Sequence, residues 1–244
     1  MNNRLLINKE GGNMPGFILH LLHGKMFLDK SDLHYSKNEI KQFQMGLLMP
    51  DANKVKKEKN DLSHFFSASQ EGKILQVPDL NSFKYRAFID NPYVLGYVAH
   101  LYLDRYFFED YFQKFVRFLD INGNSTLEKA KIKQVFLTKD QKYISVEELF
   151  SEKYLYGDYT MLNQYLAKKY CIKMVHQTDI ANIITEVNIE DFNMILEALQ
   201  RYLNDSSGNI EMNVFTIESL EIAIERYAFG FEQWADGVKS MLSI

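Results

Sequence analysis

The hydrophobic residues of this chain recur at helical spacing along most of its length, and strand-like alternation is scarce. The first such run, FILHLLHGKMFL at 17–28, predicts a helix. A second helix is predicted to start at Ser36, because Ser36 and Glu39 form a capping box. It is expected to run to Leu48 and to be stopped by Pro50.

The most apolar stretch, NPYVLGYVAHLYLDRYFF at 91–108, predicts a long helix. Asn91 followed by Pro92 is a strong start signal, because proline at the first helical position loses no hydrogen bond. The helix is expected to continue to about Leu119. Since it is apolar on most sides, we expect it to be buried at the centre of the molecule.

The rest of the chain also predicts helices, and the lysine-rich segment 51–61 is interpreted as a loop. The run SLEIAIERYAFGFEQWADGV near the C-terminus predicts an amphipathic helix that closes the core. The expected fold is a single all-α domain over 14–244, a multi-helix bundle around the long central helix; a division near 122–125 is possible but not favoured. Polar residues that can cap the remaining helices are Ser82, Ser145 with Glu148, Asp158 or Thr160, Asn188 with Asp191, and Thr216.

Composition narrows the class of protein. Apolar residues make up 46% of the 244 positions, which permits a sizeable core. The net charge of -4 argues against a nucleic-acid binder that relies on broad phosphate neutralisation. Cys171 is the one cysteine, so neither an internal disulfide nor a cysteine metal cage is expected. With no apolar stretch long enough to span a membrane, we expect a soluble, cytoplasmic protein.

The start of the chain raises a separate question. The stretch KEGGNMPG can be encoded by a purine-rich run that resembles a bacterial ribosome-binding site, placed just before the codon for Met14. One hypothesis is that Met14 is the true start and that residues 1–13 are a disordered translated leader. The alternative is an ordinary flexible N-terminus.

Two polar residues interrupt the apolar central helix. His100 and Asp104 stand at i and i+4, so they share a face, and Gly96 on that face leaves room for something to approach. An uncompensated buried carboxylate costs several kcal/mol or takes up a proton, so Asp104 needs partners. Either the pair is a hydrogen bond that fastens two helices, or both side chains bind a divalent metal.

Three further residues favour the metal. His20 lies inside an apolar helical run, Asp51 follows a proline where a helix ends, and His64 stands beside aromatic residues. Taken singly, each has an ordinary explanation as a core histidine, a turn residue or a loop histidine. Together with His100 and Asp104, they form a donor set of histidines and aspartates in apolar surroundings.

The series formed by His20, GLLMPD (46–51), SHF (63–65) and LGYVAHLYLD (95–104) resembles the bacterial zinc-dependent phospholipase C family. That family is similar to the single-strand-specific fungal nucleases, and its members have an all-helical fold and a zinc cluster held by histidines and aspartates. The likeness covers Met14 to Asp104, under half of the chain. It implies that the metal ligands, or the direct neighbours of the metals, are His20, Asp51, His64, His100 and Asp104.

The resemblance also implies roles. Asp104 is the candidate bridging carboxylate between two zinc ions, with His64 and His100 on one ion and His20 on the other. Asp51 is either a ligand or the base that orients the attacking water, and the sequence does not separate these roles.

The chain departs from the family where a further zinc would bind. No histidine follows Asp104 closely, and the later His176 has Ile180 where a glutamate would be needed. A third site is therefore absent or built otherwise, with Glu109 or Asp110 as candidates. Two more histidines have no assigned metal: His23 is expected at the surface, with a place behind the ligands as the alternative, and His34 lies in a polar connector.

The expected function is hydrolysis of a phosphoester, in particular a phosphodiester, by two zinc ions or other divalent metals. The expected substrate is a small phosphoester or a phospholipid head group. The lysines of 54–59 leave open a weak contact with a membrane surface, against the alternative of a solvated loop. The alternative functions are a non-catalytic helical module that binds metal or lipid, and an HD-type nucleotide phosphohydrolase. The second is disfavoured because no adjacent His-Asp pair occurs.

Overall fold

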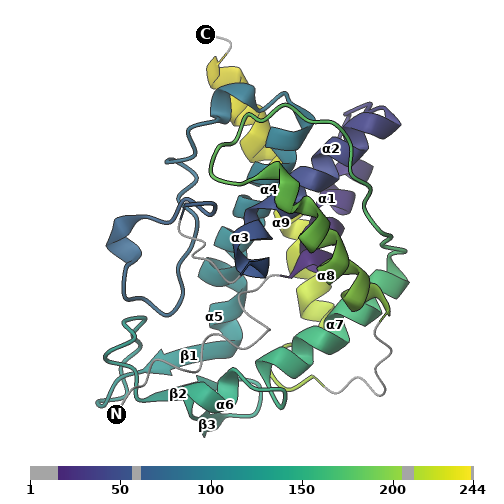
Figure 1. The fold of residues 1–244 in the computed structure, drawn as a ribbon. Coiled ribbons are helices and arrows are strands. Elements are labelled where there is room, and N and C mark those ends of the chain that lie inside the picture. The colour runs from purple at the N-terminus through teal and green to yellow at the C-terminus, as the bar shows by residue number, and fades with distance from the viewer. Residues whose placement is uncertain (1–15, 57–61, 205–211, 243–244) are drawn as a thin grey trace.

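A computed structural model describes residues 16–56, 62–204 and 212–242 of the chain (Figure 1). The leader hypothesis for residues 1–13 lies outside these ranges. The protein is mainly helical, as predicted, with one small antiparallel sheet. The elements of the first half are α1 (Phe17–Lys30), α2 (Lys37–Leu48), the 3-10 turn η1 (Met49–Asp51), α3 (Ala52–Val55), the 3-10 turns η2 (Ala68–Gln70) and η3 (Arg86–Phe88), and α4 (Pro92–Tyr106).

The predicted starts of α2 and α4 are confirmed. The Ser36 hydroxyl accepts a hydrogen bond from the Glu39 amide, and the Glu39 carboxylate accepts one from the Ser36 amide. The Asn91 side chain caps α4 by accepting bonds from the first amides of the helix. The segment after Asp51 was interpreted as a loop, but Ala52–Val55 form a short helix.

Helices α2 and α4 touch backbone to backbone. A Cβ atom on Gly96 would lie 2.0 Å from the carbonyl oxygen of Phe43, and one on Gly46 would lie 2.1 Å from that of Tyr93. The space that Gly96 leaves is therefore filled by the backbone of α2. This close crossing holds the C-terminal end of α2 against the middle of α4.

The central helix ends earlier than predicted. After α4 the chain makes a π-helical turn η4 (Phe107–Tyr111) and one turn of α5 (Phe112–Phe115), and then becomes extended. The expected helix to Leu119 is wrong over its last residues, which form strand β1 (Val116–Leu119). Pairing with a later strand, at Gln134–Leu137, overrides the local helical pattern there, because it satisfies backbone groups of Val116–Leu119.

The sheet has three strands in the order β1-β2-β3, with β2 at Gln134–Leu137 and β3 at Lys142–Ile144. Both pairs are antiparallel, with Phe118 opposite Val135 and Val135 opposite Ile144. These three side chains are buried and cover the end of the helical core. The all-α expectation is thus corrected to mainly α with a small sheet at the end of α5 (Figure 1).

The remaining elements, in the second half of the chain, are α6 (Val146–Leu149), α7 (Leu155–Lys169), the 3-10 turn η5 (Ile189–Asp191), α8 (Phe192–Asn204) and α9 (Ile217–Leu242). Of these, α9 packs against α1 and α4, and α7 packs against α1 and α8. Capping is confirmed at Ser145, Asn188 and Thr216, each of which accepts a bond from a backbone amide two or three residues later. Ser82 instead donates to Asp79 in a turn, and Thr160 lies inside a helix.

An irregular strap joins α7 to η5 and passes over the outside of α2 (Figure 1). The Gln42 amide donates to the carbonyl of Asp179 at 2.9 Å, and Tyr85 donates to the carboxylate of Glu186 at 2.7 Å. These bonds attach the strap to the helices beneath it. Within the described ranges, no helix has the length and apolar character needed to cross a bilayer.

Candidate metal centre

The residues singled out in the sequence come from separate elements and meet at one place. His20 lies on α1, Asp51 closes η1, His64 lies in a turn, and His100 and Asp104 lie one turn apart on α4. All are buried, with exposed fractions between 0% and 6%. The crossing of α2 over α4 explains the meeting, because it delivers Asp51 to the face of α4 that carries His100.

The carboxylate of Asp104 lies close to three histidine rings. Its Oδ2 lies 3.4 Å from Nε2 of His100 and 3.4 Å from Nε2 of His64. Its Oδ1 lies 3.3 Å from Nε2 of His20. Oδ1 thus lies nearest to His20, and Oδ2 lies nearest to His64 and His100.

The spacing of these atoms suits an ion better than direct bonds. His64 and His100 place their Nε2 atoms 3.2 Å apart, and Oδ1 of Asp51 lies 3.5 Å from Nε2 of His64. Nitrogen and oxygen ligands lie about 2.0–2.2 Å from zinc, so the vertices of a tetrahedral site are roughly 3.3–3.6 Å apart. The carboxylate contacts all exceed the ordinary hydrogen-bond range of about 2.7–3.2 Å.

The ring orientation of His100 sharpens this argument. Its Nδ1 lies 2.8 Å from the carbonyl oxygen of Leu47, which can only accept, so Nδ1 carries a proton. A neutral His100 then presents a lone pair at Nε2 to an oxygen of Asp104 and to a nitrogen of His64. Lone pairs that face one another need a cation or a proton between them. A carbonyl that fixes the far nitrogen is the usual support of a metal-binding histidine.

His64 is held by a strained turn. Phe65, the next residue, has φ of 54°, in the left-handed region that non-glycine residues seldom adopt. The turn is fixed by the Tyr97 hydroxyl, which donates to the carbonyl of Ser63 at 2.7 Å. The Ser63 hydroxyl lies 3.1 Å from Nδ1 of His64, which leaves Nε2 to face Asp104 and Asp51. Backbone strain of this kind is common at functional sites.

The pKa values of His20 and His100 are shifted in opposite directions. Burial lowers the pKa of His20 to about 4, an effect strengthened by His100 and opposed by Asp104. Burial also acts to lower the pKa of His100, but the negative charge of Asp104 outweighs it and raises that pKa. The imidazoles of His20 and His100 stack in parallel, 3.6 Å apart between ring centres. The raised pKa of His100 favours a proton on this ring beside the carboxylate, and a bound cation would displace that proton.

Both carboxylates are held ionised. Burial acts to raise the pKa of Asp104, but the nearby rings of His100 and His20 outweigh it and bring the pKa below its usual range. Burial likewise acts to raise the pKa of Asp51, and the ammonium of Lys54 and the His64 ring outweigh it. Buried ionised carboxylates beside imidazole nitrogens form a donor set for a divalent cation. Two groups that could hold an ion are His20 with His100 and Asp104, and Asp51 with His64 and His100.

Sequence reasoning missed the supports of the centre. The carbonyl of Leu47 and the hydroxyl of Ser63 orient two of the rings, and neither has a signature in a single sequence. Lys54 was grouped with the loop lysines, although its ammonium lies 3.5 Å from Oδ2 of Asp51. The position of Lys54 three residues after Asp51, just past a helix end, could have indicated this contact.

His23 does not lie at the surface as expected. Its ring is fully buried beside Tyr102 and Phe231, with centroid distances of 6.4 Å and 5.8 Å. Burial lowers its pKa to about 3, against the opposing effect of the Tyr227 backbone. His23 thus belongs to the packing between α1 and α9, and His34 and His176 are exposed.

The acidic candidates for a third site have other partners. Glu109 accepts a bond from Arg105 at 3.0 Å, and Asp110 pairs with Lys114 at 2.8 Å and with Arg226. Neither belongs to a group of residues that could hold a metal within the described ranges. The centre therefore consists of the residues that precede Glu109.

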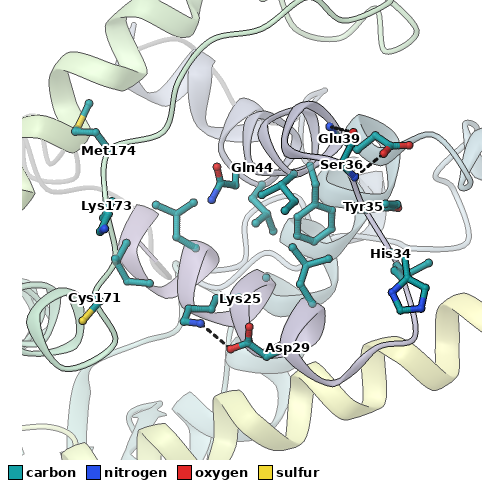
Figure 2. A pocket seen from close by; sticks show the side chains of 18 residues that line it. Lys25, Asp29, His34, Tyr35, Ser36, Glu39, Gln44, Cys171, Lys173 and Met174 are labelled. Carbon is teal, nitrogen blue, oxygen red and sulfur yellow. Dashed lines mark hydrogen bonds and ion pairs between the residues drawn. The ribbon is translucent and has the colours of Figure 1, made fainter.

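A groove of about 860 Å³ lies elsewhere, between α1, α2 and the start of the strap (Figure 2). Its floor is apolar, and Lys25 and Asp29 form an ion pair of 2.7 Å on its edge. None of the residues of the metal centre lines it. Leu47 connects the two, since its side chain lines the groove while its carbonyl orients His100.

Comparisons of the chain with protein-family models, curated proteins and solved structures find no match. The resemblance to zinc-dependent phospholipase C therefore rests on the quoted motifs.

Proposed function

We propose that this protein is a metal-dependent phosphoester hydrolase with a two-ion centre that resembles zinc-dependent phospholipase C. The observation that carries the proposal is the position of Asp104, whose oxygens face His20 on one side and His64 with His100 on the other at 3.3–3.4 Å. A carboxylate flanked in this way is suited to bridge two divalent ions. Zinc is the first candidate, because the donors are imidazole nitrogens and carboxylate oxygens.

In this proposal the ion on the His64 side has the fuller set of protein donors. His64, His100 and Asp104 supply three of them, and Asp51 supplies the fourth or acts as the base. The ion on the His20 side shares Asp104 and leaves positions for water or substrate. A pair of divalent ions lowers the pKa of bound water and neutralises the phosphoryl oxygens, which is the chemistry that phosphodiester hydrolysis needs.

In this proposal, neighbouring residues orient the histidine rings, and the burial of the cluster excludes bulk water. Leu47 and Ser63 fix the rings of His100 and His64, so that Nε2 of each is directed inward. The burial of the cluster lowers the local dielectric and strengthens the attraction between the carboxylates and any bound cation. The near-complete burial of the cluster favours a compact phosphoester group over a long nucleic acid.

Hydrolysis of a chromogenic phosphodiester tests the proposal. The protein is stripped with chelator, reloaded with zinc or manganese, and assayed beside an Asp51→Asn variant. We expect metal-dependent hydrolysis by the wild type and a loss of about 100-fold or more in the variant. If the variant keeps its metal, Asp51 is the base; if it loses metal, Asp51 is a ligand. Metal-loaded wild type that fails to hydrolyse phosphodiesters and phosphomonoesters excludes the hydrolase.

A second candidate is a non-catalytic module that holds a metal for stability. The near-complete burial of the cluster favours it, since structural metal sites are closed and catalytic ones keep an open position. Such a protein would bind metal and melt at lower temperature with chelator, yet hydrolyse no phosphoester. The same assay therefore separates the two candidates.

A further inference from the structure

We propose that Lys54 is an anion-binding residue of this centre, which contacts a phosphoryl oxygen of the substrate from the side of Asp51. The inference rests on the proposed function, and it specifies that the ligand carries a negatively charged phosphoryl group. Lys54 lies on α3, three residues after Asp51, and its ammonium is 3.5 Å from Oδ2 of that carboxylate.

Lys54 lies between the surface and the buried cluster. Its side chain is 23% exposed, whereas the Asp51 side chain is 3% exposed. The ammonium therefore reaches inward from the surface to the edge of a buried cluster. Among the described residues, Lys54 is the one basic side chain, lysine or arginine, that forms an ion pair with Asp51 or Asp104.

The two oxygens of Asp51 face different partners. Oδ1 lies 3.5 Å from Nε2 of His64, on the side of the proposed ion, and Oδ2 lies 3.5 Å from the ammonium of Lys54. Asp51 thus holds Lys54 at the rim of the ion position. An ammonium has three donors, so Lys54 can contact Asp51 and a phosphoryl oxygen at the same time.

In the proposed centre, the charge of the loaded state favours an anionic ligand. Asp51 and Asp104 contribute two negative charges and Lys54 one positive charge, while the imidazoles bound to a metal are neutral. One divalent ion then leaves an excess of one positive charge, and two ions leave an excess of three. Uncompensated charge is costly in a buried site, and an anionic phosphoryl group beside Lys54 offsets it.

Lys54 has a plainer possible role, which is to neutralise Asp51 when no metal is bound. The two roles make opposite forecasts. A counter-ion of the empty site competes with metal, so its removal raises metal affinity and leaves anion binding unchanged. An anion-binding residue contacts the ligand of the loaded site, so its removal weakens anion binding.

Calorimetric titration of zinc-loaded protein with inorganic phosphate tests the inference in wild type, Lys54→Met and Lys56→Met. Lys56→Met is the matched control, because Lys56 is two residues away and pairs with Asp191 at 3.2 Å. We expect Lys54→Met to keep its zinc and to bind phosphate roughly tenfold more weakly or worse. Lys56→Met should bind phosphate as the wild type does.

Each other outcome overturns the inference. Equal phosphate affinity in wild type and Lys54→Met, with zinc retained, rejects the role of Lys54 and leaves the proposed hydrolase intact. An equal loss in both lysine variants points to general surface charge. A wild type that binds no zinc rejects the proposed function and the role of Lys54 with it.

Discussion

Two buried carboxylate sites of this protein show opposite designs. Asp158 on α7 accepts bonds from the amides of Asn213, Val214 and Phe215 at 2.7, 2.7 and 3.0 Å. Asp104 on α4 instead faces three imidazole nitrogens at 3.3–3.4 Å. The first carboxylate has the donors that its charge requires, and the second is surrounded by nitrogens that could themselves bind a metal.

The difference separates a structural carboxylate from the carboxylate of the proposed metal centre. Asp158 ties α7 to the segment that leads into α9, and backbone donors compensate its burial. Among the residues that the structure describes, no backbone amide is found to donate to Asp104, and its neighbours stand at the spacing of ligands around an ion. Burial alone does not mark a functional carboxylate; the kind and distance of its partners do.

The largest effect is expected from Asp104→Asn. The amide keeps the shape but removes the charge that balances the cations, so metal affinity should fall more than about 100-fold and hydrolysis should nearly vanish. The melting temperature should also fall to that of the chelator-treated wild type, because a metal that binds only the folded state stabilises it. Metal analysis and melts with and without chelator measure both effects. An Asp104→Asn protein with full metal content would contradict the proposal that Asp104 differs from Asp158 in binding metal.

Asp158→Asn should behave in the opposite way. Its amide cannot accept all three backbone bonds, so we expect a loss of about 3 kcal/mol in unfolding free energy. The loss should be the same with and without chelator, and the metal content should not change. Denaturant unfolding in both conditions measures it, and a loss that disappears with chelator would show that Asp158 also depends on metal.

Gly96→Ala tests whether the helix crossing builds the centre. The added methyl would meet the Phe43 carbonyl at 2.0 Å, so α2 must move away from α4. We expect a cost of about 2 kcal/mol and weaker metal binding, because the movement displaces the Leu47 carbonyl and Asp51. Gly237→Ala is a suitable control, since a Cβ there meets nothing within 4 Å. Unchanged metal affinity in Gly96→Ala would show that the close crossing of α2 and α4 is not needed to position the metal ligands.

The smallest effect concerns His23, which is buried without being part of the cluster. Its pKa is about 3 in the folded protein against about 6.5 when unfolded, so it is neutral at pH 7. The stability that it contributes is present above pH 6.5 and is lost as the pH falls toward 3. With chelator present, His23→Leu should reduce the loss of stability between pH 7 and pH 5.5 by about 1 kcal/mol. The exposed His176→Leu should leave that loss unchanged.

The local signals in the sequence located the helices around the centre. The capping box at Ser36 and the start signal at Asn91 place α2 and α4, and the i, i+4 spacing of His100 and Asp104 places both on one face. These features depend on neighbours within one turn of helix, which a single sequence contains. The prediction that the central helix continues to Leu119 was wrong because the competing partners of that segment lie in β2.

Long-range contacts explain what the sequence left open. Nothing near His64 indicates that a left-handed Phe65 turns it inward, and Gly96 gave no sign that the approaching group was the backbone of α2. The apolar character of FILHLLHGKM did not reveal that α9 buries His23. Each of these facts depends on residues that are distant in the chain and meet only after folding.

The metal content of protein purified without chelator is the most direct test of whether the cluster of histidines and aspartates binds divalent metal. Elemental analysis of the full chain, with protein quantified in the same sample, gives ions per chain. The account predicts about two divalent ions, with zinc the first candidate, removable by chelator with a clear drop in melting temperature. Fewer than about one ion per chain, together with a melting temperature that ignores chelator, would contradict it and leave His100 and Asp104 as a buried hydrogen-bonded pair.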